Sequence, residues 1–201
     1  MNYKYQYHNY SIALYEALLD DAFYATMERS IADTAFCKEA MLRYLDYSMV
    51  EAKKYGELFI PTDHQFGVSV WSVPIDQELE AQKSLEKKSF IRNHMSQQSL
   101  EKYNEIVGIM AANAATLIDK DDWYLSIVGI LPEYQGKGLG VELVNSVLAK
   151  TDRLKVRTYL ETFTARNMTF YERLGYQVAD SFYEPTTESK YWLMLRGFDC
   201  A

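Results

Sequence analysis

Apolar residues recur at helical spacing in several long segments of the chain. Between about 10 and 27 these positions predict an amphipathic helix (Ile12, Tyr15, Leu18, Leu19, Ala22 and Phe23). The same spacing predicts helices over about 35–55, 77–94 and 100–117. The segment 77–94 is rich in charges of both signs, so we expect that helix to lie mostly in solvent.

Shorter segments rich in β-branched and aromatic residues predict strands. Residues 57–61 and 66–73 flank a polar turn at 62–65, which is typical of a β-hairpin. The alternation over 3–7 fits a short first strand or a loosely ordered terminus. The second half alternates strands and helices, with strands at about 123–131, 155–162, 176–184 and 189–197 and helices at about 136–150 and 165–174. This order predicts an α/β fold, a mixed sheet with helices on both faces.

Composition places the chain among ordinary globular proteins. With 201 residues, 48% hydrophobic and 24% charged, one domain is the expectation. We expect no membrane association, because no apolar run approaches the roughly 20 residues that span a bilayer. The N-terminal residues lack the apolar core of a secretory signal, and Cys37 and Cys200 are expected to be free thiols, so we expect a cytoplasmic protein. The net charge of −7 argues against nucleic acid as a partner and suits a cationic substrate.

The most informative feature is a glycine-rich turn between a strand and a helix. Four of the nine glycines fall between Gly129 and Gly140. Glycine within a helix costs about 1 kcal/mol relative to alanine, so a bare backbone at this place needs a reason. From Gln135 to Gly140 there is one lysine and no carboxylate, although the first turn of a helix usually carries acidic residues. The pattern predicts a phosphate group held by backbone N–H groups at the helix N-terminus.

Two common phosphate-binding motifs do not fit this turn. A Walker A loop requires Ser or Thr after its Gly-Lys pair, and here Lys137 is followed by Gly138 and then Leu139. A dinucleotide fingerprint requires glycine three positions after its second glycine, where this chain has Val141. The observed spacing is Gln-x-x-Gly-x-Gly, from Gln135 to Gly140.

This spacing resembles motif A of the GNAT acetyltransferase superfamily, and a second block agrees with it. Residues 159–176 form a predicted strand followed by Asn-x-x-Phe-Tyr-Glu-Arg-Leu-Gly-Tyr from Asn167, which is similar to motif B of that family. The closest resemblance is to the puromycin N-acetyltransferase-like branch, over about 123–180. The resemblance implies a single-domain GNAT-like mixed sheet whose fourth and fifth strands splay apart. It also implies acetyl-CoA as the acyl donor.

The resemblance assigns roles to residues of both motifs. The pyrophosphate of acetyl-CoA is expected on the turn, and its pantetheine arm on the preceding strand edge. The expected coenzyme-binding residues are Val128, Gly129, Ile130, Gln135, Gly136, Lys137, Gly138, Leu139, Gly140, Asn167 and Tyr171. The N–H of Ile130 is the candidate oxyanion donor. Asn167 could instead be a helix N-cap, and Lys137 could simply be solvated.

Two residues are the candidates for catalysis. The family places a proton donor to the departing thiolate at the position of Tyr171, where the alternative role is packing. Glu161, at the end of its strand, is the candidate base, although it could merely orient the amine or make a structural hydrogen bond. The histidines lie outside both motifs, and no metal site is expected, including at the acidic turn 119–122.

The expected acceptor is the primary amine of a small molecule. The first two helices, within about 10–55, and the final hairpin are expected to build its pocket. Candidate aromatic walls are Tyr24, Tyr44, Tyr47, Trp71 and Tyr183, although aromatic residues at such spacing are more often part of the core. The alternatives are a protein N-terminal or lysine acetyltransferase and a non-catalytic acyl-CoA binding module. The sequence leaves monomer and homodimer equally open.

Overall fold

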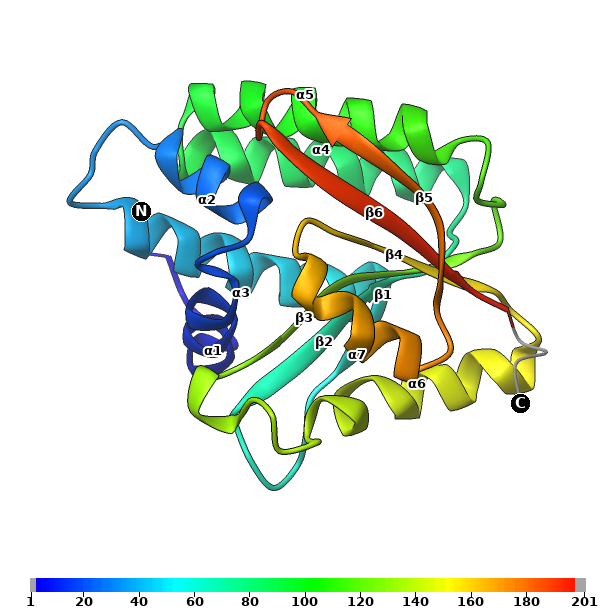
Figure 1. Ribbon diagram of the computed structural model, residues 1–201. Coiled ribbons are helices and arrows are strands. Elements are labelled where there is room, and N and C mark those ends of the chain that lie inside the picture. Colours follow the sequence, from blue (N-terminus) through cyan, green and yellow to red (C-terminus); the bar gives the residue numbers. More distant parts are fainter. Residues whose placement is uncertain (1–2, 198–201) are drawn as a thin grey trace.

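The computed structural model describes residues 3–197, which form seven α-helices and one six-stranded sheet (Figure 1). The helices are α1 (His8–Leu18), α2 (Ala22–Arg29), α3 (Cys37–Tyr55), α4 (Gln77–His94), α5 (Gln97–Ala114), α6 (Gly140–Leu154) and α7 (Met168–Arg173). The strands are β1 (Gly56–Phe59), β2 (Gly67–Ser72), β3 (Trp123–Ile130), β4 (Thr158–Thr162), β5 (Gln177–Glu184) and β6 (Ser189–Arg196). Short 3₁₀ turns η1 (Pro132–Tyr134) and η2 (Ala165–Asn167) precede α6 and α7.

The sheet is mixed, and its centre is opened. The strand order is β1-β2-β3-β4-β6-β5, with every neighbouring pair antiparallel except the parallel pair β3–β4. These two strands are in register only at Trp123–Thr158 and Tyr124–Tyr159. Beyond these pairs β3 continues beside β2 while β4 continues beside β6, so the sheet divides at its centre. The predicted mixed sheet and its splayed central strands are confirmed.

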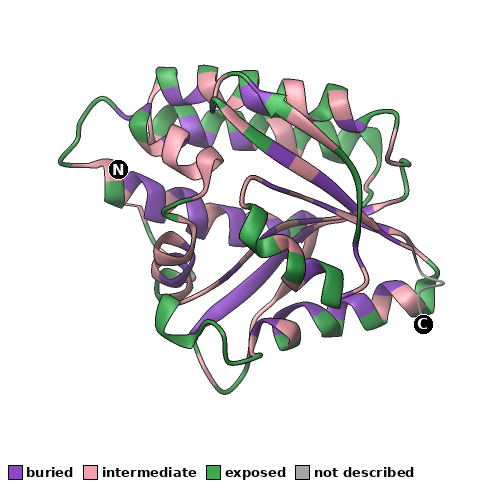
Figure 2. Cartoon of the chain, viewed as in Figure 1, coloured by how far each residue is buried: buried purple, intermediate pink, exposed green. Residues whose placement is uncertain are grey.

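Two apolar clusters cover the two faces of the sheet. One packs α1, α3 and α4 against Val68, Val70 and Ile127, and the other packs α6 and α7 against Trp71 and Leu125. Figure 2 shows the buried residues gathered along β2 and along the inner side of α3. The register between β2 and β3 shifts at Val70/Trp71, which is why Leu125 and Ile127 serve opposite faces although they are two residues apart.

The N-terminal region differs from its sequence prediction in two ways. The segment predicted as one helix over 10–27 is divided into α1 and α2, because the carboxylate of Asp21 accepts the N–H of Phe23 and begins a new helix. Residues 3–7 are neither a strand nor loose. The backbone N–H groups of Gln6 and Tyr7 donate to the buried carboxylate of Asp46, at 3.1 and 2.6 Å.

The other predicted elements are confirmed with ends shifted by a few residues, including the hairpin that became β1 and β2. Within residues 3–197, no helix combines the length and apolar character that a membrane span requires. Cys37 is a free thiol, and Cys200 lies outside the described residues.

Candidate active site

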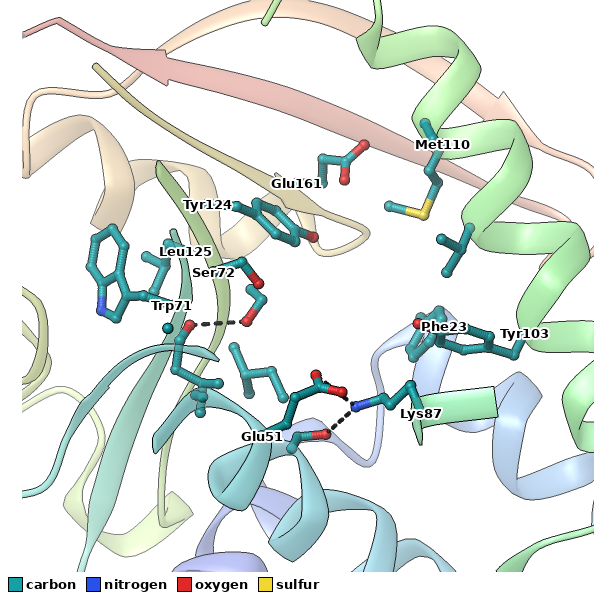
Figure 3. Close-up of a pocket in the computed structure, with 18 of the residues that line it drawn as sticks. Phe23, Glu51, Trp71, Ser72, Lys87, Tyr103, Met110, Tyr124, Leu125 and Glu161 are labelled. Atoms are coloured by element: carbon teal, nitrogen blue, oxygen red, sulfur yellow. Dashed lines mark hydrogen bonds and ion pairs between the residues drawn. The ribbon is translucent and has the colours of Figure 1, made fainter. Parts of the chain in front are cut away.

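A cavity of about 590 Å³ lies where β3 and β4 separate. Its wall includes four of the predicted coenzyme-binding or catalytic residues, namely Val128 of β3, Glu161 of β4, Asn167 of η2 and Tyr171 of α7. The other predicted residues, at 129–130 and 135–140, do not line it. The fold therefore brings one predicted residue of the first motif's strand and three predicted residues of the second motif to one chamber, part of which Figure 3 shows.

Glu161 is a partly buried residue whose carboxylate lacks a cationic partner among the described residues. Its Oε1 is inaccessible to solvent and has no hydrogen-bond partner. Burial raises the pKa of Glu161 to about 7, and the neighbouring hydroxyl of Tyr124 opposes that shift. A carboxyl group with this pKa can both accept and release a proton near neutrality. Tyr124, on β3, was not predicted from the sequence as a site residue, because it lies in the alternating pattern that any strand residue shows.

Tyr171 is buried and lines the same cavity. Burial is the main cause that raises the pKa of its phenol, and Asp21 and Tyr176 add to the effect. The hydroxyl therefore keeps its proton at neutral pH. Asn167 precedes α7 in a helical conformation and makes no side-chain capping hydrogen bond. Its alternative role as an N-cap is thus not realised, and it lines the cavity instead.

The glycines of the glycine-rich turn are required for two different physical reasons. Gly136 and Gly138 adopt φ of +73° and +80°, a region that side chains disfavour. Gly140 is required by packing, because a Cβ there would lie 2.9 Å from Cε2 of Phe170. Our sequence interpretation assigned all three to ligand approach, and for Gly140 the structure gives a packing reason.

The turn presents free donors. In the described chain, no hydrogen bond engages the backbone N–H groups of residues 136–140, which precede or begin α6. The side chain of Gln135 donates to the carbonyl of Ile130 at 2.9 Å and so ties the turn to the strand end. The Lys137 ammonium lies 5.1 Å from the ring centre of Tyr134. Free N–H groups at the positive end of a helix fit the phosphates of a coenzyme.

The exposed edge of β3 supplies a second row of donors. The N–H of Leu131 donates to Phe66 beside β2 at 2.8 Å. Because successive N–H groups of a strand point to alternate edges, those of Ile130 and Val128 face the edge that β4 has left. Gly129 has a different role, since a Cβ there would lie 2.8 Å from Cδ2 of Leu14 on α1. The strand edge is thus open to an extended ligand, while Gly129 serves the packing of α1.

The acceptor side of the cavity differs from the sequence prediction. Tyr24, Tyr44 and Trp71 line the cavity, but Tyr47 and Tyr183 do not. Tyr47 stacks on Phe90, and Tyr183 is largely exposed on β5. The wall opposite the sheet comes from α4 and α5 rather than from the final hairpin, through residues that include Lys87, Tyr103 and Met110. The charge pattern of α4 concealed this role, because one inward lysine among many looks like part of a solvated face.

In the described part of the chain, no group of three possible metal ligands lies in the wall of this cavity. The acidic turn 119–122 instead holds Arg157, whose guanidinium reaches Asp122 at 2.6 Å. Among the described residues, Asp63, His64 and Glu142 bring one ligand atom each within 4.8 Å of one another, outside the cavity wall. His8 and His94 also lie away from the cavity lining.

Comparisons with known proteins agree with this geometry. The model of the acetyltransferase (GNAT) family matches residues 64–176. Among solved structures, a protein from Corynebacterium glutamicum titled as histone acetyltransferase HPA2 and related acetyltransferase is 22% identical (TM-score 0.58; 95% of this chain and 90% of that chain). Arylalkylamine N-acetyltransferase 2 from Aedes aegypti is 14% identical (TM-score 0.62; 96% and 94%). Polyamine N-acetyltransferase from Drosophila melanogaster is 13% identical (TM-score 0.51; 81% and 81%).

Proposed function

The chain belongs to the GNAT family of acyl-CoA-dependent N-acyltransferases, and we propose that it moves an acetyl group from acetyl-CoA to the primary amine of a small molecule. The observation that carries this proposal is the presence of Glu161 and Tyr171 in the wall of one cavity at the strand opening, together with Val128 of the strand that leads into the glycine-rich turn. The turn itself does not line that cavity, and its N–H groups at 136–140 are free of hydrogen bonds within the described chain.

The residues present fit the acyl donor. The N–H groups of 136–140 would bind its pyrophosphate, and the edge of β3 from Val128 to Ile130 would pair with its pantetheine arm. Asn167, whose side chain makes no capping bond, would contact the same arm. Lys137 would add a positive charge near the phosphates. Acetyl-CoA itself supplies a thioester, whose carbonyl carbon is open to attack by an amine.

The proposed reaction is direct transfer. Glu161 takes a proton from the acceptor ammonium, and the freed amine nitrogen forms a bond to the thioester carbonyl carbon. The N–H of Ile130 stabilises the oxyanion, an interaction typically worth about 2.7–4 kcal/mol in the transition state. When the carbon–sulfur bond breaks, the phenol of Tyr171 gives its proton to the departing thiolate. The attacking nitrogen then loses its second proton to the Tyr171 phenolate, which leaves a neutral amide and a neutral phenol, and Glu161 releases its proton to solvent.

The acceptor class is supported by the charge of the cavity. Four carboxylates (Asp21, Glu51, Glu80 and Glu161) and three lysines (Lys83, Lys87 and Lys88) line it, so the carboxylates outnumber the lysines by one and favour a cation. Two of the similar structures are named for arylalkylamine and polyamine acetylation. Both names are consistent with a small amine, and neither specifies which one.

The test is turnover of acetyl-CoA with a panel of amines and peptides, read by release of the coenzyme thiol. Release with small amines supports the proposal. Release with peptides alone would assign the chain to protein N-terminal or lysine acetylation. Binding of acetyl-CoA without release on any acceptor would make it a non-catalytic acyl-CoA module.

Several finer predictions accompany this function. We propose that the whole chain acts as one N-acetyltransferase domain, with helices within about 10–55 toward the acceptor and the coenzyme site within about 123–180. The resemblance of that second segment to the puromycin N-acetyltransferase-like branch stays a prediction and does not specify the acceptor. The cytoplasmic location stays a prediction as well.

A further inference from the structure

A second carboxylate, Glu51 of α3, lines the cavity on the side away from Glu161 (Figure 3). Its side chain is only 15% exposed. Its Oε2 lies 3.5 Å from the ammonium of Lys87, while its Oε1 is buried without a hydrogen-bond partner. A buried carboxylate oxygen without a donor is costly, so this atom is a ready acceptor for a ligand.

Lys87 is already held by the protein. Its ammonium donates to Oγ of Ser48 at 3.0 Å and lies 4.7 Å from the ring centre of Tyr44 and 5.2 Å from that of Tyr47. The side chain is buried, and that burial lowers its pKa. The lysine therefore engages one oxygen of Glu51 and leaves the other without a partner.

The groups around Oε1 of Glu51 favour a ligand that carries a second hydrogen-bond donor. Tyr55 lines the same cavity, and its hydroxyl is buried without a hydrogen-bond partner. The rings of Tyr44 and Tyr103 line this side, and aromatic faces attract cations. Lys83, which lines the same wall, is paired with Glu80 at 3.3 Å, whereas the exposed Lys88 of that wall has no ion-pair partner among the described residues.

We propose that the acceptor carries a second nitrogen donor, an ammonium or a guanidinium, that binds Oε1 of Glu51 while its reacting amine lies against Glu161. This inference rests on the proposed function and adds the class of acceptor, a diamine or a comparable dication. A site built to accept a hydrogen bond discriminates strongly against an analogue that lacks the donor, because the protein atom is then left unpaired. A monoamine of the same length is such an analogue.

The experiment compares matched acceptors on the wild-type protein. Putrescine is paired with n-pentylamine and cadaverine with n-hexylamine, since each pair differs by replacement of the second amine with a methyl group. Release of the coenzyme thiol gives kcat/KM, corrected for the two reactive nitrogens of each diamine. We expect the diamine to be preferred by about tenfold or more.

The variant Glu51→Gln tests the assignment to Glu51. We expect kcat/KM for the diamine to fall about tenfold, while the value for the monoamine stays within about twofold of wild type. Glu86→Gln is the matched control, because Glu86 forms an ion pair with Lys54 at 2.9 Å and does not line the cavity. We expect that control to leave both values unchanged.

The possible outcomes distinguish a failure of the second-nitrogen site from a failure of the proposed acetyltransferase function. Equal turnover of diamines and monoamines by the wild type would overturn the second-nitrogen site and leave amine acetylation standing, whether or not Glu51→Gln folds. A preference for γ-aminobutyrate over both would also overturn it and would assign the ligand to Lys87. Bound acetyl-CoA with no turnover of any amine would refute the proposed function itself.

Discussion

Replacing Glu161 by glutamine should make the protein more stable above neutral pH while it removes most of the activity. The carboxyl group is buried, and its pKa of about 7 in the folded chain compares with an ordinary value of 4.5. Between these two values the folded state binds more protons than the unfolded state. Stability must therefore fall as pH rises from 4.5 through about 7, and the loss is complete above that range.

The size of the effect follows from the same two values. Their difference corresponds to about 3 kcal/mol of folding free energy, an upper bound because a relaxing protein or entering water lowers it. Glutamine has nearly the shape of the protonated carboxyl group and cannot ionise. We expect Glu161→Gln to exceed wild type by about 1–3 kcal/mol at about pH 8 and to equal it at about pH 4.

Urea unfolding of both proteins across this pH range measures the difference by linear extrapolation. Glu172→Gln is the matched control, because Glu172 is the exposed neighbour of Tyr171 on α7, and its stability should follow the wild type at every pH. In parallel, kcat should fall by about a hundredfold or more if Glu161 is the base. A variant no more stable than wild type at about pH 8 would show that Glu161 is solvated or paired in solution, and would refute the argument from burial.

Three further substitutions test other parts of the site. Tyr171→Phe should lower kcat by about 10–100-fold with acetyl-CoA affinity unchanged in calorimetry; an unchanged rate would assign Tyr171 to packing. Gly138→Ala should weaken acetyl-CoA binding about tenfold, because alanine at φ of +80° costs about 1–2 kcal/mol, whereas Gly197→Ala, at a residue that does not line the cavity, should leave binding unchanged. Gly129→Ala should lower stability in urea by about 1–3 kcal/mol, because its Cβ would lie 2.8 Å from Leu14; a neutral result would mean that α1 can move away.

The sequence alone predicted the strand, the turn and the helix on which the proposed coenzyme site lies. The run from Gly129 to Gly140 specifies a strand, a turn and a helix start within twelve residues, so local backbone preference decides its shape. The positive φ of Gly136 and Gly138 agrees with that prediction. Similarly, the pattern beginning at Asn167 placed a tyrosine one turn into a short helix.

The sequence was misleading where a distant partner decides the conformation. Residues 3–7 alternate like a strand, but the carboxylate of Asp46, some forty residues away, binds their N–H groups instead. Gly140 looked like a position required by a ligand, whereas the ring of Phe170 is what excludes a side chain there. Neither contact leaves a periodic signal, since one residue on each side is enough to make it.

The acceptor side of the cavity was decided by tertiary structure alone. Glu51, Lys87 and Tyr103 come from three helices whose inward residues share the helical spacing of ordinary core positions. Local preference fixes dihedral angles over a few neighbouring residues, so the chain itself determined the coenzyme turn and the helix that follows it. Only the packing of α3, α4 and α5 against a divided sheet could bring an ion pair and an unpaired carboxylate oxygen to face Glu161, because burial and charge pairing depend on residues far apart in the chain.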